Sequence, residues 1–343
     1  MFDTDTKKLI VNNIRGYFLT PIISFFGKEG FFEIMLSKKT FNTKDFKNIK
    51  YKIKLLVIFK YLSRLGLLKN IDNKKNMFEL TSLGYDLTKR YSSYFVPYSY
   101  KNYINNIDLF LNSNKNFSVD RELNILGSGK THQRYFIPAI YHLKNHVKPD
   151  SIIDIGTGSG DFLLNASKYL NLQKVFGVDL SKKSVQVASK NLKKIKKKTK
   201  SKIICCDGNK VDTWSLIAKK YIPKGPNVIT LWFLLHEISN FKINLIESFL
   251  KKLKKEFPKS EVIICELVNA PDSVLALNKE VSIIPEYLFF HDLSNQGVLS
   301  WDEIQLVIKK TGYKLIKEYL FDDLINIDGN ASIPSTCVLI LRP

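Results

Sequence analysis

The chain has 343 residues, 45% hydrophobic and 25% charged, and its 53 Lys and Arg against 32 Asp and Glu give a net charge of +21. This length predicts about two domains, and the composition excludes a mostly disordered or collagen-like chain. Uninterrupted apolar runs are far shorter than the roughly 20 residues of a spanning helix, so we expect no transmembrane segment and no membrane partner. The first residues lack a secretion pattern, and we therefore expect a cytoplasmic protein.

Residues 1–95 are predicted to form a mostly helical domain with one hairpin. Apolar residues recur at helical spacing over 9–26 and 52–65. Two strand-like runs, 67–71 and 77–80, then flank a turn-rich loop. Helices followed by a β wing predict a winged-helix domain, whose use could be dimerisation or DNA binding.

The positive charge raises the question of a nucleic-acid partner. Nearly all of the basic excess is Lys, whereas Arg is the residue that most often reads base edges. Because Arg is scarce, we do not expect a nucleic-acid partner, and a DNA-binding regulator is the least favoured alternative. Arg occurs only at positions 15, 64, 90, 121, 134 and 342.

Residues 96–145 are predicted to form a helical linker or lid. Gly127-Ser128-Gly129 predicts a turn, and a helix is expected to follow over 132–147. An aromatic cluster marks the start of this region and is more typical of packing between domains than of a ligand site. It comprises Tyr91, Tyr94, Phe95, Tyr98, Tyr100 and Tyr103.

Residues 146–343 show an alternation of strand and helix patterns. Such alternation predicts an α/β domain with a mostly parallel sheet and helices on both faces. The predicted strands are 151–155, 174–178, 202–206, 227–233, 262–266, 313–321 and 335–341.

The sharpest motif is the glycine loop from Asp154 to Gly160, Asp-Ile-Gly-Thr-Gly-Ser-Gly, which follows a predicted strand and opens a helix. Glycines let the backbone approach a ligand, and the helix start offers free N–H groups. Asp179 and Asp207 end the next two strands, where they could reach a ribose and an adenine. A doubly wound domain with chance acids is the alternative. A dinucleotide site is disfavoured, because Asp161 stands where its third glycine would be.

These motifs resemble those of class I S-adenosylmethionine-dependent methyltransferases, over about residues 120–343. The resemblance implies a Rossmann-like domain with a seven-stranded sheet and S-adenosylmethionine as cofactor. The helical first domain makes the chain similar to small-molecule O-methyltransferases of natural-product biosynthesis. That group implies a small-molecule acceptor and a homodimer formed through the winged-helix domain. The implied cofactor-binding residues are Asp154, Gly156, Gly158, Gly160, Asp179, Leu180, Asp207, Gly208 and Phe233.

The fourth strand runs into Leu235-His236-Glu237, which resembles the L-H-D-W segment of that group. The His of that segment is the general base, and a His at a strand's carboxyl end titrates near working pH. This segment departs from the pattern at Glu237 and Ile238. We expect His236 to take the proton of a hydroxyl acceptor, steered by Glu237 or Asp292. A core histidine without catalytic function is the alternative.

His291 supports a second interpretation. Neutral imidazoles of His236 and His291 could hold a divalent iron or zinc ion. The chain is also similar to metal-dependent 2-oxo acid C-methyltransferases, in which the metal acts as Lewis acid. Arg134 could pair with an acceptor carboxylate, or could be an ordinary surface arginine. We expect O-methylation ahead of this metal-assisted C-methylation.

Overall fold

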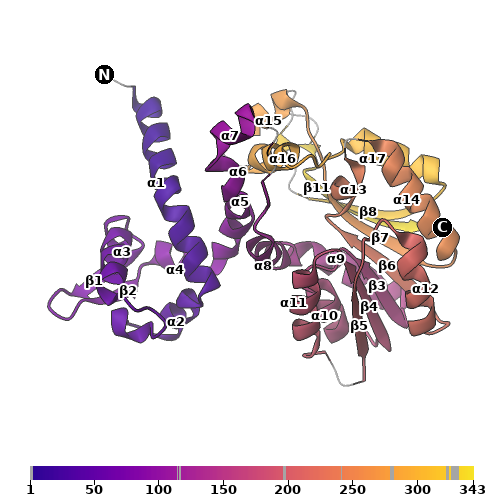
Figure 1. Cartoon of the computed structure of the whole chain (residues 1–343), viewed down its shortest axis with the longest axis horizontal. Helices are drawn as coiled ribbons and strands as arrows, with labels where there is room; N and C mark the ends of the chain where they lie inside the picture. The colour runs from indigo at the N-terminus through magenta and orange to yellow at the C-terminus, as the bar shows by residue number, and fades with distance from the viewer. Residues whose placement is uncertain are drawn as a thin grey trace.

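The computed structural model describes residues 3–343 except 114, 116, 196–197, 241, 279–281, 322–323 and 326–331. A small helical part formed by the N-terminal residues lies beside a larger α/β part, and a run of short helices joins them (Figure 1). The chain therefore follows the predicted order of helices, linker and alternating strands.

The N-terminal part is held together by a core of phenylalanine rings. Phe59 on the third helix is fully buried and lies 5.3 Å from the ring of Phe46 and 5.4 Å from that of Phe78. Edge-on contacts of this kind stabilise beyond the area they bury. The elements are α1 (Thr4–Lys28), α2 (Phe31–Ser37), a 3₁₀ turn (Thr43–Asp45), α3 (Lys52–Arg64), the antiparallel hairpin β1 (Leu68–Asp72) and β2 (Met77–Leu80), and α4 (Ser82–Arg90).

Helix α1 is apolar but largely uncovered. Leu9, Ile14 and Tyr17 are 61%, 56% and 71% exposed. By length and composition alone α1 could cross a membrane, since an 18-residue window has a mean hydropathy of 1.2 and is only 17% buried. Length and composition do not by themselves place a helix in a membrane, so the expectation of no transmembrane segment stays a prediction. The sequence argument looked for unbroken apolar runs, whereas α1 mixes Asn and Gly among its apolar residues.

The linker is helical, as predicted, but its glycines do not form a turn. Gly127 and Gly129 lie inside α8, where atoms of neighbouring residues come close to both of them. A Cβ on Gly127 would lie 3.0 Å from the backbone nitrogen of Val96, and one on Gly129 would lie 1.9 Å from a carboxylate oxygen of Asp161. The linker elements are a 3₁₀ turn (Tyr91–Tyr94), α5 (Phe95–Ser99), α6 (Lys101–Ile104), α7 (Ile107–Asn112), α8 (Arg121–Thr131) and α9 (Gln133–His142).

The α/β part contains a seven-stranded sheet in the order β5-β4-β3-β6-β7-β11-β8. The first five strands in this order are parallel, and β11 is antiparallel to both of its neighbours. Strands β4 and β5 extend the sheet on one side of β3, whereas β6 and β7 extend it on the other side. Such a topological switch point opens a crevice at the carboxyl ends of the strands. The strands are β3 (Ser151–Ile155), β4 (Lys174–Asp179), β5 (Lys200–Cys205), β6 (Asn227–Trp232), β7 (Glu261–Leu267), β8 (Lys314–Phe321) and β11 (Thr336–Arg342).

Helices cover both faces of this sheet (Figure 1). One face carries α12 (Val211–Tyr221), α14 (Ile243–Glu256) and α17 (Trp301–Thr311), while α9 and α10 (Asp161–Tyr169) pack on the other. The sequence therefore predicted the fold class correctly. The remaining elements are α11 (Lys182–Leu192), α13 (Leu235–Ser239), α15 (Asp272–Asn278), α16 (Ile284–Leu293) and the short pair β9 (Leu324–Ile325) and β10 (Ser332–Ile333).

Candidate active site

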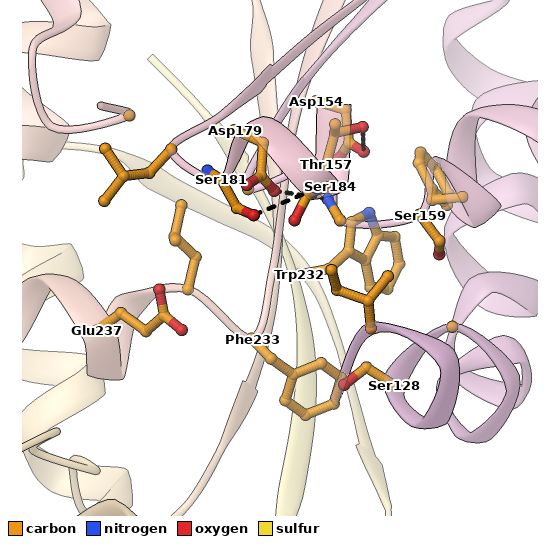
Figure 2. A pocket seen from close by; sticks show the side chains of 18 of the residues that line it. Ser128, Asp154, Thr157, Ser159, Asp179, Ser181, Ser184, Trp232, Phe233 and Glu237 are labelled. Carbon is orange, nitrogen blue, oxygen red and sulfur yellow. Dashed lines mark hydrogen bonds between the residues drawn. The ribbon is translucent and has the colours of Figure 1, made fainter. Parts of the chain in front are cut away.

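A cavity of about 380 Å³ lies at the switch point of the sheet. The loops after β3, β4, β5 and β6 form its floor, and α8 closes it from above. Figure 2 shows Asp179, Thr157 and Trp232 gathered around this space, with Glu237 on the opposite side. The strand ends that the sequence singled out thus meet in one place.

The glycine loop after β3 turns through backbone angles that other residues rarely adopt. The φ angles of Gly156, Gly158 and Gly160 are 72°, 52° and 76°. A side chain at Gly156 would also approach Leu234 to 3.1 Å. The positive φ angles therefore favour glycine at these three positions. The loop leads directly into α10, and Gly156, Gly158 and Ser159 line the cavity at the start of this helix.

Asp179 at the end of β4 is tied to this loop. One carboxylate oxygen accepts the N–H of Gly158 at 2.8 Å, and the other accepts the N–H of Ser181 at 2.8 Å. Burial raises the pKa of Asp179, and these backbone donors oppose the shift. The carboxylate lines the cavity, where its remaining lone pairs can accept the hydroxyls of a ribose.

Asp154 supports the loop. Its two carboxylate oxygens accept the hydroxyls of Thr157 at 2.8 Å and Thr230 at 2.6 Å. Burial raises its pKa to about 7, although both hydroxyls act in the opposite direction. Both oxygens are already engaged, so Asp154 fixes the backbone beneath the cavity; its expected direct contact with a cofactor remains a prediction.

The opposite end of the cavity is formed by Leu180, Asp207 and Gly208. Asp207 accepts the N–H of Asn209 at 2.9 Å, and Gly208 accepts the indole N–H of Trp214 at 2.9 Å. Leu180 is 72% exposed and gives this end an apolar edge. An apolar surface beside a carboxylate suits a flat base with an amino group.

Phe233 follows β6 in a strained conformation, with a φ of 52°. Its ring stacks on His132 at a centroid distance of 3.9 Å, and both residues line the cavity. Burial lowers the pKa of His132 to about 3, so this imidazole is neutral at working pH. The sequence analysis did not predict His132 as a cavity residue, because His132 was used there only as the first residue of an expected helix.

His236 is buried at the start of α13, where Glu266 contacts it. The Nδ1 atom donates to the Glu266 carboxylate at 2.6 Å. The same carboxylate accepts the backbone N–H of Leu235 at 2.7 Å and that of Leu267 at 2.8 Å. Burial alone would lower the pKa of His236, but the charge of Glu266 outweighs it and raises the pKa above its usual value. With Nδ1 engaged by Glu266, the neutral imidazole keeps a lone pair on Nε2.

His291 on α16 lies against His236. The two ring centroids are 4.5 Å apart with planes at 86°. The Nδ1 atom of His291 donates to the backbone carbonyl of Tyr287, so its Nε2 carries a lone pair. Burial lowers the pKa of His291 to about 4, and the neighbouring His236 contributes to the shift. The structure therefore brings together the two histidines that the sequence proposed.

Glu266, rather than Glu237 or Asp292, orients His236, and the expectation that one of those two would do so was wrong. Glu237 is partly exposed and pairs with Arg121 at 3.4 Å. Asp292 is exposed on α16. Glu266 could have been found from the sequence, because it stands next to the end of β7 as Asp179 stands at the end of β4, at the same edge of the sheet.

Arg134 is exposed on α9 and contacts Tyr135. Its guanidinium donates to the Tyr135 hydroxyl at 2.5 Å and lies 4.6 Å from the centre of that ring. Its expected role toward an acceptor carboxylate remains a prediction.

The linker packs on α16 beside the histidines. Tyr100 stacks on Phe290 at 4.8 Å with planes only 10° apart. Burial raises the pKa of Tyr287 to about 12, so its hydroxyl stays protonated. Aromatic rings of the linker and of α16 therefore pack against each other, in agreement with the expected packing between domains.

Comparison with known proteins identifies the chain. Residues 130–318 match the family described as methyltransferase domain, which is more than half of the sequence. The protein belongs to this family and is an S-adenosylmethionine-dependent methyltransferase with a class I fold. A search of curated proteins gives no significant match.

Solved structures with the same fold include human N-acetylserotonin methyltransferase in complex with S-adenosylmethionine, at a TM-score of 0.68 and 11% identity, covering 100% of this chain and 99% of that one. The mitomycin 7-O-methyltransferase MmcR aligns at 0.61 and 12% identity over 98% of both chains. The pyocyanin biosynthetic protein PhzM aligns at 0.57 and 11% identity over 99% of both. At these identities the likeness establishes the shared two-part fold.

Proposed function

We propose that this methyltransferase methylates a hydroxyl oxygen of a small-molecule metabolite, with His236 as general base. The observation that carries the proposal is the contact of 2.6 Å between His236 and the buried Glu266. That contact fixes the tautomer in which Nε2 accepts a proton, as a general base requires.

The residues of the cavity fit the cofactor. Asp179 offers acceptors for ribose hydroxyls, and the glycine loop that holds it lines the same cavity. S-adenosylmethionine, when bound, supplies a methyl group on a positively charged sulfur. Catalysis then depends mainly on holding the attacking oxygen in line at short range.

His236 would take the acceptor proton as the oxygen attacks. The imidazolium that forms is stabilised by the Glu266 carboxylate, which is buried and held by the backbone of Leu235 and Leu267. Buried carboxylates interact strongly with a nearby positive charge because little water screens them.

A methyl-transfer assay tests this proposal. Purified protein is incubated with methyl-labelled S-adenosylmethionine and a panel of phenols, alcohols and 2-oxo acids. We expect label on an oxygen of a phenol or alcohol, unaffected by chelators. Label only on the carbon of a 2-oxo acid would contradict O-methylation.

Metal-assisted C-methylation of a 2-oxo acid is the second candidate, and the histidine pair favours it. Both Nδ1 atoms are occupied, one by Glu266 and one by the Tyr287 carbonyl, which leaves both Nε2 atoms as ligands. Metal-binding histidines usually have this second contact. The described residues hold no group of three or more metal-binding side chains, so the acceptor's own oxygens and water would complete the coordination. Iron or zinc, when bound, would act as Lewis acid there.

Metal analysis of the purified protein separates the two candidates. The metal candidate predicts about one bound iron or zinc per chain, with loss of metal in His236→Ala and also in His291→Ala. Protein that is active and free of metal would contradict it. His146→Ala, at an exposed position, is the matched control.

We further propose that the protein is a homodimer formed through the N-terminal part. The side chains of Leu9, Ile14 and Tyr17 form part of an exposed apolar surface on α1. Exposed apolar surfaces of this kind are typical of protein–protein interfaces. Light scattering should give a dimer for the natural chain and a monomer for Ile14→Glu. Leu216→Glu, exposed on α12, should leave the dimer intact. A monomeric natural chain would refute this proposal.

A further inference from the structure

Helix α8 lies over the cofactor cavity, and Arg121, Asn124 and Ser128 on this helix line it. Figure 1 shows α8 between the N-terminal part and the sheet. Gly129 of the same helix lies so close to Asp161 at the start of α10 that a Cβ there would come within 1.9 Å of a carboxylate oxygen. Any movement of α8 would therefore change the access to the cavity.

Helix α8 is attached to the N-terminal part near both of its ends. At its start, Glu122 accepts a hydrogen bond from Lys28, the last residue of α1, at 3.1 Å. Near its other end, Lys130 donates to the hydroxyl of Tyr91, which in turn donates to Glu33 of α2 at 2.8 Å. We therefore expect α8 to move together with the N-terminal part.

Among the described residues, two ion pairs connect the start of α8 to the α/β part. The carboxylate oxygen of Glu122 that contacts α1 also accepts a hydrogen bond from Lys183 of α11 at 2.9 Å. The neighbouring Arg121 pairs with Glu237 of α13 at 3.4 Å. Helices α11 and α13 follow β4 and β6, the strands on either side of β3, so the two pairs reach both sides of the cavity.

Glu122 is thus the residue at which α1, α8 and α11 meet. Hydrogen bonds from Lys183 and Lys28 lower the pKa of Glu122, so its carboxylate is charged at neutral pH. The side chains of Lys28, Glu122 and Lys183 are 37%, 33% and 53% exposed. Ion pairs at such positions are weak and are screened by salt, so they can break and form again while the fold is kept.

We propose that the ion pairs of Glu122 with Lys28 and Lys183 hold α8 over the cofactor cavity and slow the exchange of the cofactor. After methyl transfer, S-adenosylhomocysteine has to leave this cavity, and the opening of such covers limits turnover in many enzymes. The N-terminal part would in this way control product release. The inference rests on the cofactor site described above and is independent of the acceptor.

Stopped-flow mixing with S-adenosylhomocysteine tests this inference without turnover. Tryptophan fluorescence can follow the reaction, because Trp232 lines the cavity. Glu122→Gln removes the charge and keeps the size of the side chain. We expect the rate constants of association and dissociation both to rise by about 3–10-fold. The Kd should change by less than about twofold, because Glu122 is not expected to touch the ligand.

Lys28→Gln should raise both rate constants by about twofold, although Lys28 lies on α1, outside the cavity. Salt should increase the rates of the natural chain more than those of Glu122→Gln, because it screens exposed charges. The matched control is Glu256→Gln, which removes the pair of 2.6 Å with Lys219 between α14 and α12. We expect this variant to leave both rates unchanged.

Rates equal to those of the natural chain in both Glu122→Gln and Lys28→Gln would overturn the inference. A weaker affinity of Glu122→Gln with an unchanged association rate would overturn it too, because Glu122 would then only maintain the shape of the cavity. If Glu122→Gln does not fold, Lys183→Gln gives the same readout. A natural chain that does not bind S-adenosylhomocysteine would overturn the inference together with the cofactor site, whereas failure of the exchange rates alone leaves that site intact.

Discussion

The cofactor side and the proposed acceptor side of this site are built in different ways. The cofactor side is a run of seven residues, Asp154 to Gly160, joined to Asp179 on the neighbouring strand. The acceptor side joins residues from distant parts of the chain. His236 meets Glu266 from β7 and His291 from α16, and Tyr100 of the linker stacks on Phe290.

This difference separates shared chemistry from specificity. The glycine loop is set by backbone conformation, so its sequence is constrained wherever the same nucleoside is bound. The acceptor side depends on how the linker and α16 pack, and packing can change while the fold is kept. Variants on each side should therefore affect different measurements.

The largest expected effect lies on the acceptor side. His236→Ala removes the proton acceptor and should lower turnover by about 10²–10⁴-fold. The affinity for S-adenosylhomocysteine should stay unchanged, because His236 is outside the cofactor cavity. Steady-state kinetics and calorimetry measure the two effects, with His146→Ala as control. Turnover equal to that of the natural chain would refute the base assignment.

On the cofactor side, Asp179→Ala removes the acceptor of the Gly158 and Ser181 N–H groups and of a ribose. We expect the affinity for S-adenosylhomocysteine to fall by about 10–100-fold. The matched control is Asp212→Ala, at an exposed position on α12. If the affinity does not fall, the nucleoside does not lie on Asp179.

The pH dependence of turnover tests the contact between His236 on α13 and Glu266 on β7. His236 must be neutral to act, and Glu266 raises its pKa, so turnover should fall as the pH drops through a value above 6.5. Glu266→Gln removes the charge and should move this acidic limb to lower pH, with a lower plateau because the imidazolium loses its partner.

Glu237→Gln is the control for that shift. The charge of Glu237 also raises the pKa of His236, but without a hydrogen bond. The acidic limb of Glu237→Gln should therefore move to lower pH by less than that of Glu266→Gln. An acidic limb that stays in place in Glu266→Gln would mean that another group controls it.

The smallest expected effect concerns the contact between linker and α16. Tyr100→Leu removes the stack on Phe290 and should lower the free energy of unfolding by about 1 kcal/mol. Urea unfolding measures it, and Tyr169→Leu, at a 60% exposed position, should have no such effect. Unchanged stability in Tyr100→Leu would show that the stack contributes nothing.

Local patterns predicted most of the fold. Helical spacing located α1 and α3, turn residues located the hairpin β1–β2, and the alternation located the strands of the main sheet. The glycines of α8 misled the prediction, because a buried glycine that admits a neighbouring segment looks the same in sequence as one that forms a turn.

The same limit applies to the site. The glycine loop, Asp179 and Asp207 could be found because they stand at the ends of consecutive strands. Glu266 follows the same rule, because it stands near the end of β7 at this edge of the sheet. The role of His132 could not be assigned, since it depends on stacking against Phe233, which lies far away in the chain.

A crystal structure with S-adenosylhomocysteine tests the central claim most directly. The account predicts that the ribose hydroxyls contact Asp179 and that the thioether sulfur lies beside Phe233, facing the side of His236. A nucleoside bound elsewhere, or a cavity filled by the protein's own side chains, would contradict it.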